Sequence, residues 1–233
     1  MIREKKKWMA YTYFHRNPGF HWKTTHLFSP VRKKIPGMVC ISCPTLIAEI
    51  KECDFVNTWS KSTRYKISKA ENDELTLQRG PELLPEILKL FSETANAKNL
   101  RGHFPEDFDS RPWILCTAIF KGEKIIAGHV WIIDEEERRG LLFVNASAHH
   151  DDDMDSSMTG RAHYYLLWQD GMYMRNHGID YMDLNGYNIT ANDPSLSGVY
   201  TWKEGTHGRK EDLFHYFPVW FYWLKRINKK LPR

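Results

Sequence analysis

Three polar residues near the end of the chain have types and spacing that suit charge stabilisation and proton transfer. Lys203 lies in W-K-E-G-T-H-G, where two glycines confine a cation within a short turn. A lysine held in this way can neutralise a phosphate or stabilise an oxyanion. Asp183 ends a predicted strand, where it could orient or deprotonate an amine. His207 carries an imidazole that titrates near neutral pH.

Each of these residues also has a plainer interpretation. Lys203 could be a solvated lysine at a helix end. Asp183 could cap the Leu184-Asn185-Gly186 turn by accepting a hydrogen bond from the backbone, as aspartates in turns do. His207 lies in a predicted loop, so we treat it as a contact residue rather than a base.

Two clusters have the composition of metal sites but not the spacing. In A-H-H-D-D-D-M-D, residues 148–155, consecutive carboxylates cannot all face one ion, which favours a solvated acidic loop. Cys40 and Cys43 form C-I-S-C with no second pair at zinc-ribbon spacing, and the flanking residues suit a strand end. We therefore expect no metal, and we expect the four cysteines to be reduced thiols.

The elements that must position these residues follow a mixed α/β order. Hydrophobic spacing predicts helices over residues 64–72, 81–99, 160–178 and 217–230. Alternation predicts strands over residues 75–80, 113–120, 124–133, 141–148 and 179–188. The three central strands are joined by two short polar turns and form an antiparallel meander. Residues 1–58 are aromatic and loop-rich, and we expect them to pack on the rest.

Composition sets the broad class of the protein. Of 233 residues, 42% are hydrophobic and 14% aromatic, which excludes general disorder. No apolar run approaches the roughly 18 to 20 residues that span a membrane, and no signal-peptide pattern begins the chain, so we expect a cytoplasmic protein. Four cysteines are too few for a disulfide scaffold at this length.

Charge is distributed unevenly along the chain. Residues 1–34 carry a net charge of +8 and residues 200–233 a net charge of +5, so a total of +4 leaves −9 for the middle. Basic ends attract polyanions such as RNA, a phosphorylated glycan precursor or an anionic membrane surface. The alternative is solvated surface charge with a basic tail.

Aromatic residues are mixed with the lysines of the N-terminal segment. They could stack on RNA bases, although such residues more often become core and interface. The residues concerned are Trp8, Tyr11, Tyr13, Phe14, Phe20 and Trp22.

Three ordered motifs resemble the Fem-like branch of the GNAT-fold acyltransferases, which builds peptidoglycan bridges. The resemblance covers about residues 60–220. The matching residues are Arg64, Ile67, Lys69, Ala70 and Glu71 in the first motif, Leu166, Leu167, Trp168, Gly178, Asp183 and Gly186 in the second, and Trp202, Lys203, Gly205 and Gly208 in the third. The chain departs from the pattern at Asn185 and His207, where that branch usually has glycines.

The resemblance implies a fold, a domain division and an activity. The fold would be GNAT-like, with a central mixed sheet, an antiparallel meander and then helix-strand-helix, in a domain over residues 59–233. The enzyme would move an acyl or aminoacyl group to an amine. Its donor would be a thioester, acyl-CoA or acyl carrier protein, with aminoacyl-tRNA in second place. The acceptor would be a cell-envelope sugar or peptide precursor, small or lipid-linked, and no cofactor would be tightly bound. tRNA binding and peripheral membrane contact stay open, and the alternative is an inactive module that binds a glycan or RNA.

The resemblance also implies where the groups of the site lie. Residues 140–147 and 180–184 should be neighbouring parallel strands whose C-terminal ends diverge around the donor. A helix beginning near Gly160 should aim its N–H groups at phosphate, although an ordinary N-cap with a surface arginine is equally consistent with the sequence. Lys203 and Asp183 would be catalytic. The implied donor-binding residues are Asn145, Ser147, Ser156, Ser157, Thr159, Gly160 and Arg161. The implied acceptor-binding residues are Asn185, Gly186, Tyr200, Trp202, Gly205, His207 and Gly208.

Overall fold

The computed structural model describes residues 2–6, 9–13, 18, 26–97, 114–148, 155–187 and 197–228. The chain folds into two compact units that interleave along the sequence. The terminal unit comprises Met1–Thr45, Gly186–Asn188 and Lys210–Arg233, and the central unit comprises Leu46–Asn185 and Ile189–Arg209. This division differs from the single boundary after residue 58 expected from the sequence.

The central unit is built on a mixed sheet in the order β4-β9-β8-β7-β6-β5. The strands are β4 (Met38–Glu49), β5 (Thr76–Arg79), β6 (Ile114–Lys121), β7 (Lys124–Asp134), β8 (Arg139–Ser147) and β9 (Tyr181–Asp183). β5 to β8 run antiparallel in sequence order, which confirms the predicted meander. β9 pairs parallel with β8 and antiparallel with β4.

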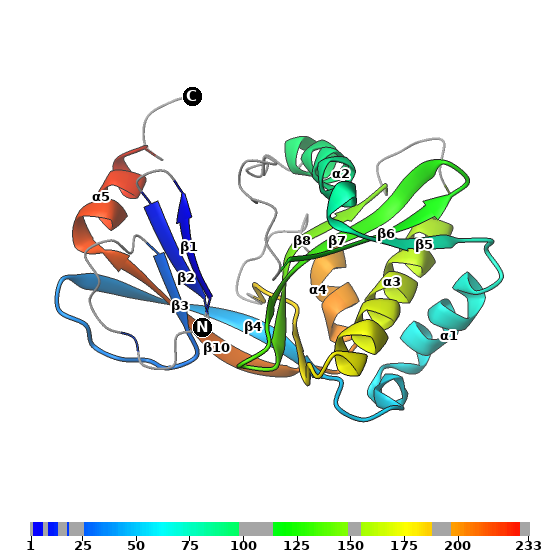
Figure 1. The fold of residues 1–233 in the computed structure, drawn as a ribbon, viewed down its shortest axis with the longest axis horizontal. Helices are drawn as coiled ribbons and strands as arrows, with labels where there is room; N and C mark the ends of the chain where they lie inside the picture. Colours follow the sequence, from blue (N-terminus) through cyan, green and yellow to red (C-terminus); the bar gives the residue numbers. More distant parts are fainter. Residues whose placement is uncertain are drawn as a thin grey trace. The chain divides into compact units, whose positions relative to one another are not determined.

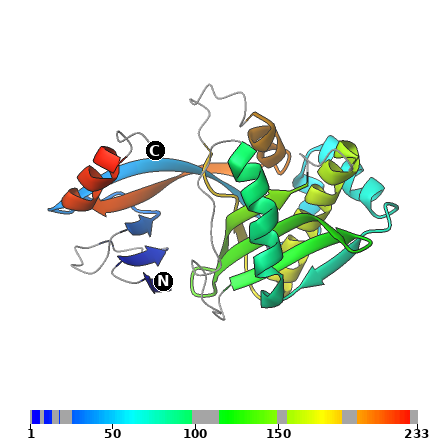
Figure 2. The ribbon, with the colours of Figure 1, turned by 90° about the horizontal axis from the view of Figure 1, so that it is seen from above.

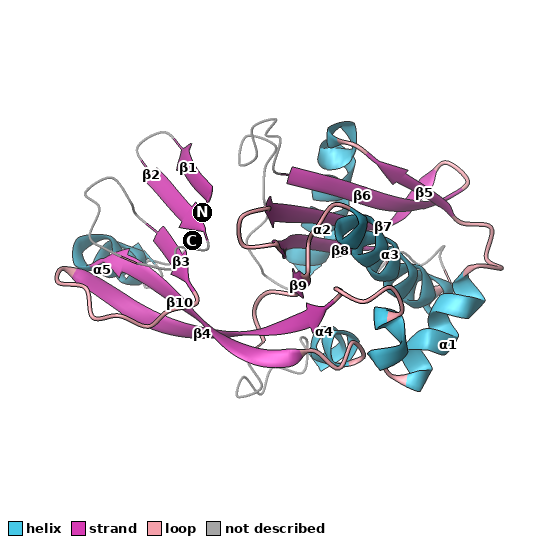
Figure 3. Ribbon diagram, turned by 60° about the horizontal axis from the view of Figure 1, so that its bottom comes forward, coloured by secondary structure: helices cyan, strands magenta, loops and turns pink. Residues whose placement is uncertain are grey.

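Helices cover both faces of this sheet. The α-helices of the central unit are α1 (Lys61–Ala70), α2 (Leu84–Ala97), α3 (Ser156–Asn176) and α4 (Ser197–Glu204), with short 3-10 turns at Phe55–Thr58 and Pro81–Leu83. α2 lies on one face, and α3 with α1 lies on the other (Figures 1 and 2). Figure 3 shows α3 crossing β6, β7 and β8.

Local sequence explains where these helices begin and end. The Ser60 side chain accepts a hydrogen bond from Thr63 N (3.1 Å) and so satisfies one of the free N–H groups at the start of α1. α3 ends in the predicted Asn-His-Gly stop, where Gly178 has φ 80°, a conformation that glycine adopts without strain. The start of α1 and the end of α3 are therefore fixed by residues that are adjacent to them in the sequence.

A large apolar cluster of the central unit is built from α2 and the sheet, and it also includes Ala162 and Leu166 of α3. Leu83, Ile87 and Leu90 pack against Val130 and Ala146. Gly128 on β7 permits this contact, because a Cβ there would lie 2.8 Å from the Ile87 side chain. The α3 side of the same sheet is more polar, and it holds the groups described below.

The terminal unit contains strands that the sequence did not reveal. Its sheet runs in the order β1-β2-β3-β10-β4. The added strands are β1 (Ile2–Lys6), β2 (Met9–Tyr13), β3 (His26–Ser29) and β10 (Arg209–Pro218). The helix α5 (Val219–Asn228) confirms the helix predicted over residues 217–230. The loop-rich interpretation of residues 1–58 is therefore wrong for the strands. β1 and β2 pair with each other, whereas β3 pairs with β10 and β4 with β9, both far away in the chain. Cys40 and Cys43 lie within β4, and all four cysteines are free thiols.

One tyrosine anchors the small core of the terminal unit. Tyr216 packs with Leu27 and Ile35, and its hydroxyl accepts from Lys33 N (2.6 Å) and donates to Val31 O (2.9 Å). These bonds fix the loop between β3 and β4.

No helix in the described ranges combines the length and apolar character needed to cross a bilayer.

Candidate functional site

The neighbouring strands β8 and β9 part after three residue pairs. Arg139 lies opposite Tyr181, and the ladder ends at the Leu141–Asp183 pair, although β8 continues to Ser147. Beyond that point β9 follows β4, because Leu184 N donates to Leu46 O (2.9 Å). The predicted parallel pairing is confirmed, with α3 as the crossover.

A β-bulge lies at the point where the strands part. Val130 faces Val144 and Trp131 faces Leu142, so Phe143 has no residue opposite it on β7. Bulges increase strand twist and redirect side chains. The end of β8 is thus turned away from β9 at the residues just before Asn145.

Lys203 is buried beside the end of β9. It lies in the last turn of α4 with 7% of its surface exposed, and its Nζ donates to Asn185 O (2.6 Å). Burial lowers the pKa of this ammonium to about 8, and the charge of Asp183 partly offsets that effect. The interpretation of Lys203 as a solvated lysine is therefore wrong.

Asp183 is fully buried, and both of its carboxylate oxygens are engaged. Arg139 donates to Oδ2 through Nη2 (2.6 Å) and Nε (3.2 Å), while Asn185 N donates to Oδ1 (2.8 Å). The last bond is the turn-capping bond considered above. Because its oxygens already accept these bonds, Asp183 is better suited to holding Arg139 and the turn than to removing a proton.

Two residues that replace the usual glycines have left-handed backbone. Asn185 has φ 57° and His207 has φ 51°. Glycine adopts this region without strain, and Asn and His are among the side chains most often found there. The fold therefore needs positive φ at both positions, and this chain achieves it without glycine.

Asn145 is held by a histidine that the sequence analysis did not single out. His163 Nε2 hydrogen-bonds Asn145 Oδ1, and because an amide oxygen only accepts, the imidazole donates. The His163 ring stacks on Trp202 with centroids 4.6 Å apart and planes at 16°. Two consecutive residues of α4 thus contact the two strands that part. Trp202 stacks on His163, which holds Asn145 of β8, and Lys203 donates to the Asn185 carbonyl just after β9.

Polar residues form a row in register across the sheet beneath α3. Arg79 faces Thr117, Thr117 faces His129, and His129 faces Asn145 on successive strands. Because side chains alternate between faces, directly opposed residues share one face of the sheet. The row runs from the edge strand β5 to the place where β8 and β9 part.

The centre of this row is a buried histidine–aspartate pair. His129 Nδ1 and Trp131 Nε1 each lie 2.7 Å from Asp170 Oδ2, and neither His129 nor Asp170 is exposed. His129 Nε2 and Asp170 Oδ1 have no hydrogen-bond partner among the described residues. One feature of the sequence could have pointed to these residues. His163 and Asp170 are seven residues apart, so they lie on the same side of a helix.

The start of α3 carries its own carboxylates. The helix begins at Ser156 rather than near Gly160, with Asp155 accepting from Ser157 N (2.8 Å). Arg161 donates to both Asp73 oxygens (2.7 and 3.0 Å), which raises the pKa of its guanidinium. These contacts match the ordinary N-cap alternative and place negative charge where phosphate was expected.

The remaining donor-side candidates lie around this helix start and the end of β8. Thr159 is buried, and its hydroxyl donates to Asp155 O (3.2 Å). Ser156 is exposed, Gly160 has open space beside its Cα, and Ser147 is the last residue of β8. The structure therefore places Asn145, but not Ser156 or Arg161, in the row of polar residues beneath α3.

Two candidate acceptor-side glycines are explained by packing. A Cβ on Gly205 would lie 2.4 Å from Thr63 Oγ1, and one on Gly208 would lie 2.8 Å from Ile47 O. Gly205 O also accepts from Ser60 N (2.9 Å), which ties the end of α4 to the start of α1. Close approach of the backbone accounts for glycine at both positions.

The other acceptor-side candidates are divided among three places. His207 is exposed, and its Nδ1 lies 2.9 Å from Thr58 O. Tyr200 is half-buried in α4, whereas Gly186 is exposed and belongs to the terminal unit. His207 and Gly208 line a surface hollow of about 430 Å³ together with Ile47, Glu49, Glu52, Phe55, Thr58, Thr206 and Arg209.

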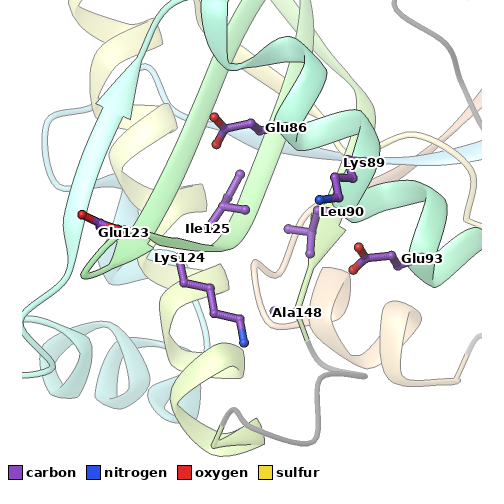
Figure 4. Close-up of a pocket in the computed structure, with 8 residues that line it drawn as sticks. All are labelled: Glu86, Lys89, Leu90, Glu93, Glu123, Lys124, Ile125 and Ala148. Carbon is purple, nitrogen blue, oxygen red and sulfur yellow. The ribbon is translucent and has the colours of Figure 1, made fainter.

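A second hollow of about 440 Å³ lies on the α2 side of the sheet. Figure 4 shows the glutamates and lysines that line it together with apolar residues. The lining residues are Glu86, Lys89, Leu90, Glu93, Glu123, Lys124, Ile125 and Ala148. Its mixed charges give no preference for one ligand class, and none of the polar row on the α3 side lines it.

Some expectations fall outside the described residues. The acidic segment 149–154 and the side chains of residues 1–17 are among them. Within the described ranges no group of three or more histidine, cysteine, aspartate or glutamate side chains is placed to hold a metal ion.

Comparison with solved structures identifies the fold. The chain is similar to FemX, with 12% identity, a TM-score of 0.58, and coverage of 80% of this chain and 64% of FemX, which is less than two thirds of that protein. It is also similar to L-PGS from Bacillus licheniformis, with 12% identity, a TM-score of 0.54, and coverage of 88% and 74%.

A third match has the same level of similarity. The C-terminal domain of a proposed lysylphosphatidylglycerol synthetase from Agrobacterium fabrum has 13% identity, a TM-score of 0.52, and coverage of 83% of this chain and 68% of that one. No protein-family model and no curated protein matches the sequence. The structural matches show that this chain has the fold shared by FemX and these lysylphosphatidylglycerol synthetase-type structures.

Proposed function

We propose that this protein is an acyltransferase that moves an acyl or aminoacyl group to the amine of a cell-envelope sugar or peptide precursor. The observation that carries the proposal is the buried Lys203 beside the Arg139–Asp183 pair, where β8 and β9 part. A desolvated cation at such a place has the properties needed to stabilise charge on a reacting carbonyl.

The reaction joins the acceptor nitrogen to the donor carbonyl carbon. Attack by a neutral amine places negative charge on the carbonyl oxygen, and the carbon–sulfur or carbon–oxygen bond of the donor then breaks. The proton lost by the nitrogen goes to the departing thiolate or alkoxide. Lys203 stabilises that oxygen, because a cation in a dry site interacts more strongly than one in water. Asp183 holds Arg139 and the Asn185 turn, and so fixes the backbone against which Lys203 lies.

The donor is a thioester, acyl-CoA or acyl carrier protein, or else an aminoacyl-tRNA. Asp155 caps α3, and Asp73 holds Arg161. A carboxylate at the helix start repels a diphosphate group there. This arrangement supports donors whose phosphates bind elsewhere. It favours aminoacyl-tRNA over acyl-CoA, whereas the sequence analysis put the thioester first and aminoacyl-tRNA second.

The second candidate is a scaffold that binds a glycan or RNA without catalysis. The engagement of both Asp183 oxygens by Arg139 and Asn185 favours it, because that carboxylate then has little capacity left for a substrate. Under this alternative, Lys203 would be a binding residue only.

Ligand-induced stabilisation separates these candidates. Thermal unfolding is measured with CoA, acyl-CoA, and charged and uncharged tRNA, and co-purifying ligands are identified by mass spectrometry. A ligand at 100 times its Kd stabilises the protein by about 2.7 kcal/mol. The donor found in this way is then used to measure single turnover with wild-type protein, Lys203→Met and the exposed-lysine control Lys89→Met. Turnover by wild-type and Lys89→Met but not by Lys203→Met supports the enzyme, and binding without turnover supports the scaffold.

A further inference from the structure

The exposed face of α5 is apolar. Val219, Trp220, Trp223 and Leu224 have 42%, 51%, 53% and 48% of their surface exposed. At about 100° per residue these four positions cover an arc of about 140° on one side of the helix. They therefore form one continuous face, which we call the α5 apolar face. The helix α5 itself is labelled in Figure 1.

The other side of α5 is fixed to its own unit. Phe221 is 7% exposed and stacks with Phe217 of β10, with ring centroids 6.4 Å apart. The exposed tryptophans are thus presented by an anchored helix. Contiguous exposed apolar residues on a soluble protein mark interaction surfaces.

The unit that carries this face is strongly basic. Its three segments contain fifteen lysines and arginines and three acidic residues, a net charge of +12, which leaves −8 for the central unit. The last nine residues of the chain, directly after Leu224, include five basic residues and no acidic one. In the loop after β3, Val31 is exposed next to exposed Arg32, Lys33 and Lys34.

We propose that the α5 apolar face inserts into the headgroup layer of an anionic lipid bilayer. Tryptophan and leucine beside basic residues are the composition of helices that lie in a membrane interface, where rings enter the acyl boundary and cations face lipid phosphates. RNA would account for the basic charge of the terminal unit, but it would not account for the exposed apolar side chains of Val219 and Leu224. A protein partner would leave the excess of fifteen cations over three acids unexplained.

This inference does not depend on the proposed acyl transfer. It concerns α5 and the charge of the terminal unit, whereas the proposed reaction uses Lys203 of the central unit. Loss of one activity can therefore be observed while the other is retained.

The test uses the full chain and vesicles of two compositions. Phosphatidylglycerol-containing vesicles and pure phosphatidylcholine vesicles are sedimented with wild-type protein at about 0.1 M and 0.5 M salt. We expect binding to the anionic vesicles, at least tenfold weaker binding to the neutral ones, and weaker binding at high salt because of charge screening. The double variant Trp220→Ser/Trp223→Ser should bind anionic vesicles at least tenfold more weakly.

Two controls keep the result interpretable. Trp220→Phe/Trp223→Phe retains apolar rings and should bind close to wild type, while Tyr65→Ser removes a tyrosine that is 63% exposed on α1 of the central unit and should change nothing. Circular dichroism and thermal unfolding verify that each variant folds.

Three results would overturn the proposal. The first is equal vesicle binding by wild type and the serine variant. The second is wild-type dimers, detected by light scattering, that the serine variant abolishes without any vesicle binding, which would make the face a contact between copies. The third is absence of vesicle binding together with salt-sensitive binding of bulk tRNA, which would assign the basic unit to RNA.

Discussion

The two units differ in the sign of their charge and in what they bury. The terminal unit has a net charge of +12 and exposes tryptophans, whereas the central unit has −8 and buries charges. Among the described residues every buried charged side chain belongs to the central unit: Asp134, Asp170, Asp183 and Lys203. Buried ions cost free energy unless they are paired, so their concentration in one unit marks where chemistry is expected.

The contrast also shows why total charge misleads. The +4 of the whole chain is the difference between two large opposite values, and the basic residues come from both ends of the sequence. β10 and α5 join the N-terminal strands in one unit, so the fold gathers charges that the sequence separates. The following predictions test this contrast, from the largest expected effect to the smallest.

Asp170→Ala should lower the free energy of unfolding by roughly 3 kcal/mol. The substitution leaves His129 and the Trp131 indole without their shared acceptor in a dry layer. The matched control is Asp180→Ala, whose partner Arg138 is exposed, and it should cost less than about 1 kcal/mol. Urea denaturation measures both. Similar losses for the two variants would show that the buried contacts of Asp170 contribute no more to stability than the Asp180–Arg138 pair does.

Lys203→Ala should lower turnover by roughly 10² or more and leave the fold intact. That is the scale expected when one charge-stabilising donor is lost from an acyl-transfer site. Single-turnover kinetics with the identified donor measures the effect, and thermal unfolding verifies the fold. Unaltered turnover would restrict Lys203 to a structural role.

The pH profile should fall above about pH 8. Burial disfavours the charged amine and lowers the pKa of Lys203 to about 8, so the cation is lost as pH rises through that value. If the cation stabilises the oxyanion, kcat/KM drops about tenfold by pH 9. Lys203→Arg, whose guanidinium does not titrate in this range, should flatten the profile. A rise through pH 8 in the wild type that Lys203→Arg abolishes would show that the neutral amine of Lys203 acts as a base.

The N-terminal cations should contribute to polyanion binding by the terminal unit. Because Ile2–Lys6 form β1, deleting residues 1–7 would remove a strand, so substitution is the cleaner test. Arg3→Gln/Lys5→Gln/Lys6→Gln should weaken binding of bulk tRNA several-fold. It should also make the plot of log affinity against log salt shallower, by about 0.7 to 0.9 for each phosphate that a cation no longer neutralises. The control Lys89→Gln/Lys124→Gln lies in the central unit, and identical salt slopes in the two variants would end the case for phosphate binding through β1.

The sequence by itself determined the elements whose signals are local. The meander over β6, β7 and β8 follows from alternation and short polar turns, and α3 follows from its apolar residues and its Asn-His-Gly stop. The parallel pairing of β8 with β9 follows from one rule, since a helix between neighbouring strands requires a crossover. These features need only residues close in the chain, so they could be predicted.

Only the tertiary structure decided the burial and the partners of the site residues. Lys203 has a sequence typical of an exposed turn, and its burial depends on β9, 20 residues earlier in the chain. Arg139 reaches Asp183 across 44 positions, and His129 reaches Asp170 across 41. β3, β4 and β10 were missed for the same reason, because a strand is stabilised by partners that need not be near it in sequence. Contacts of this kind arise when the chain closes on itself, and local spacing holds no record of them.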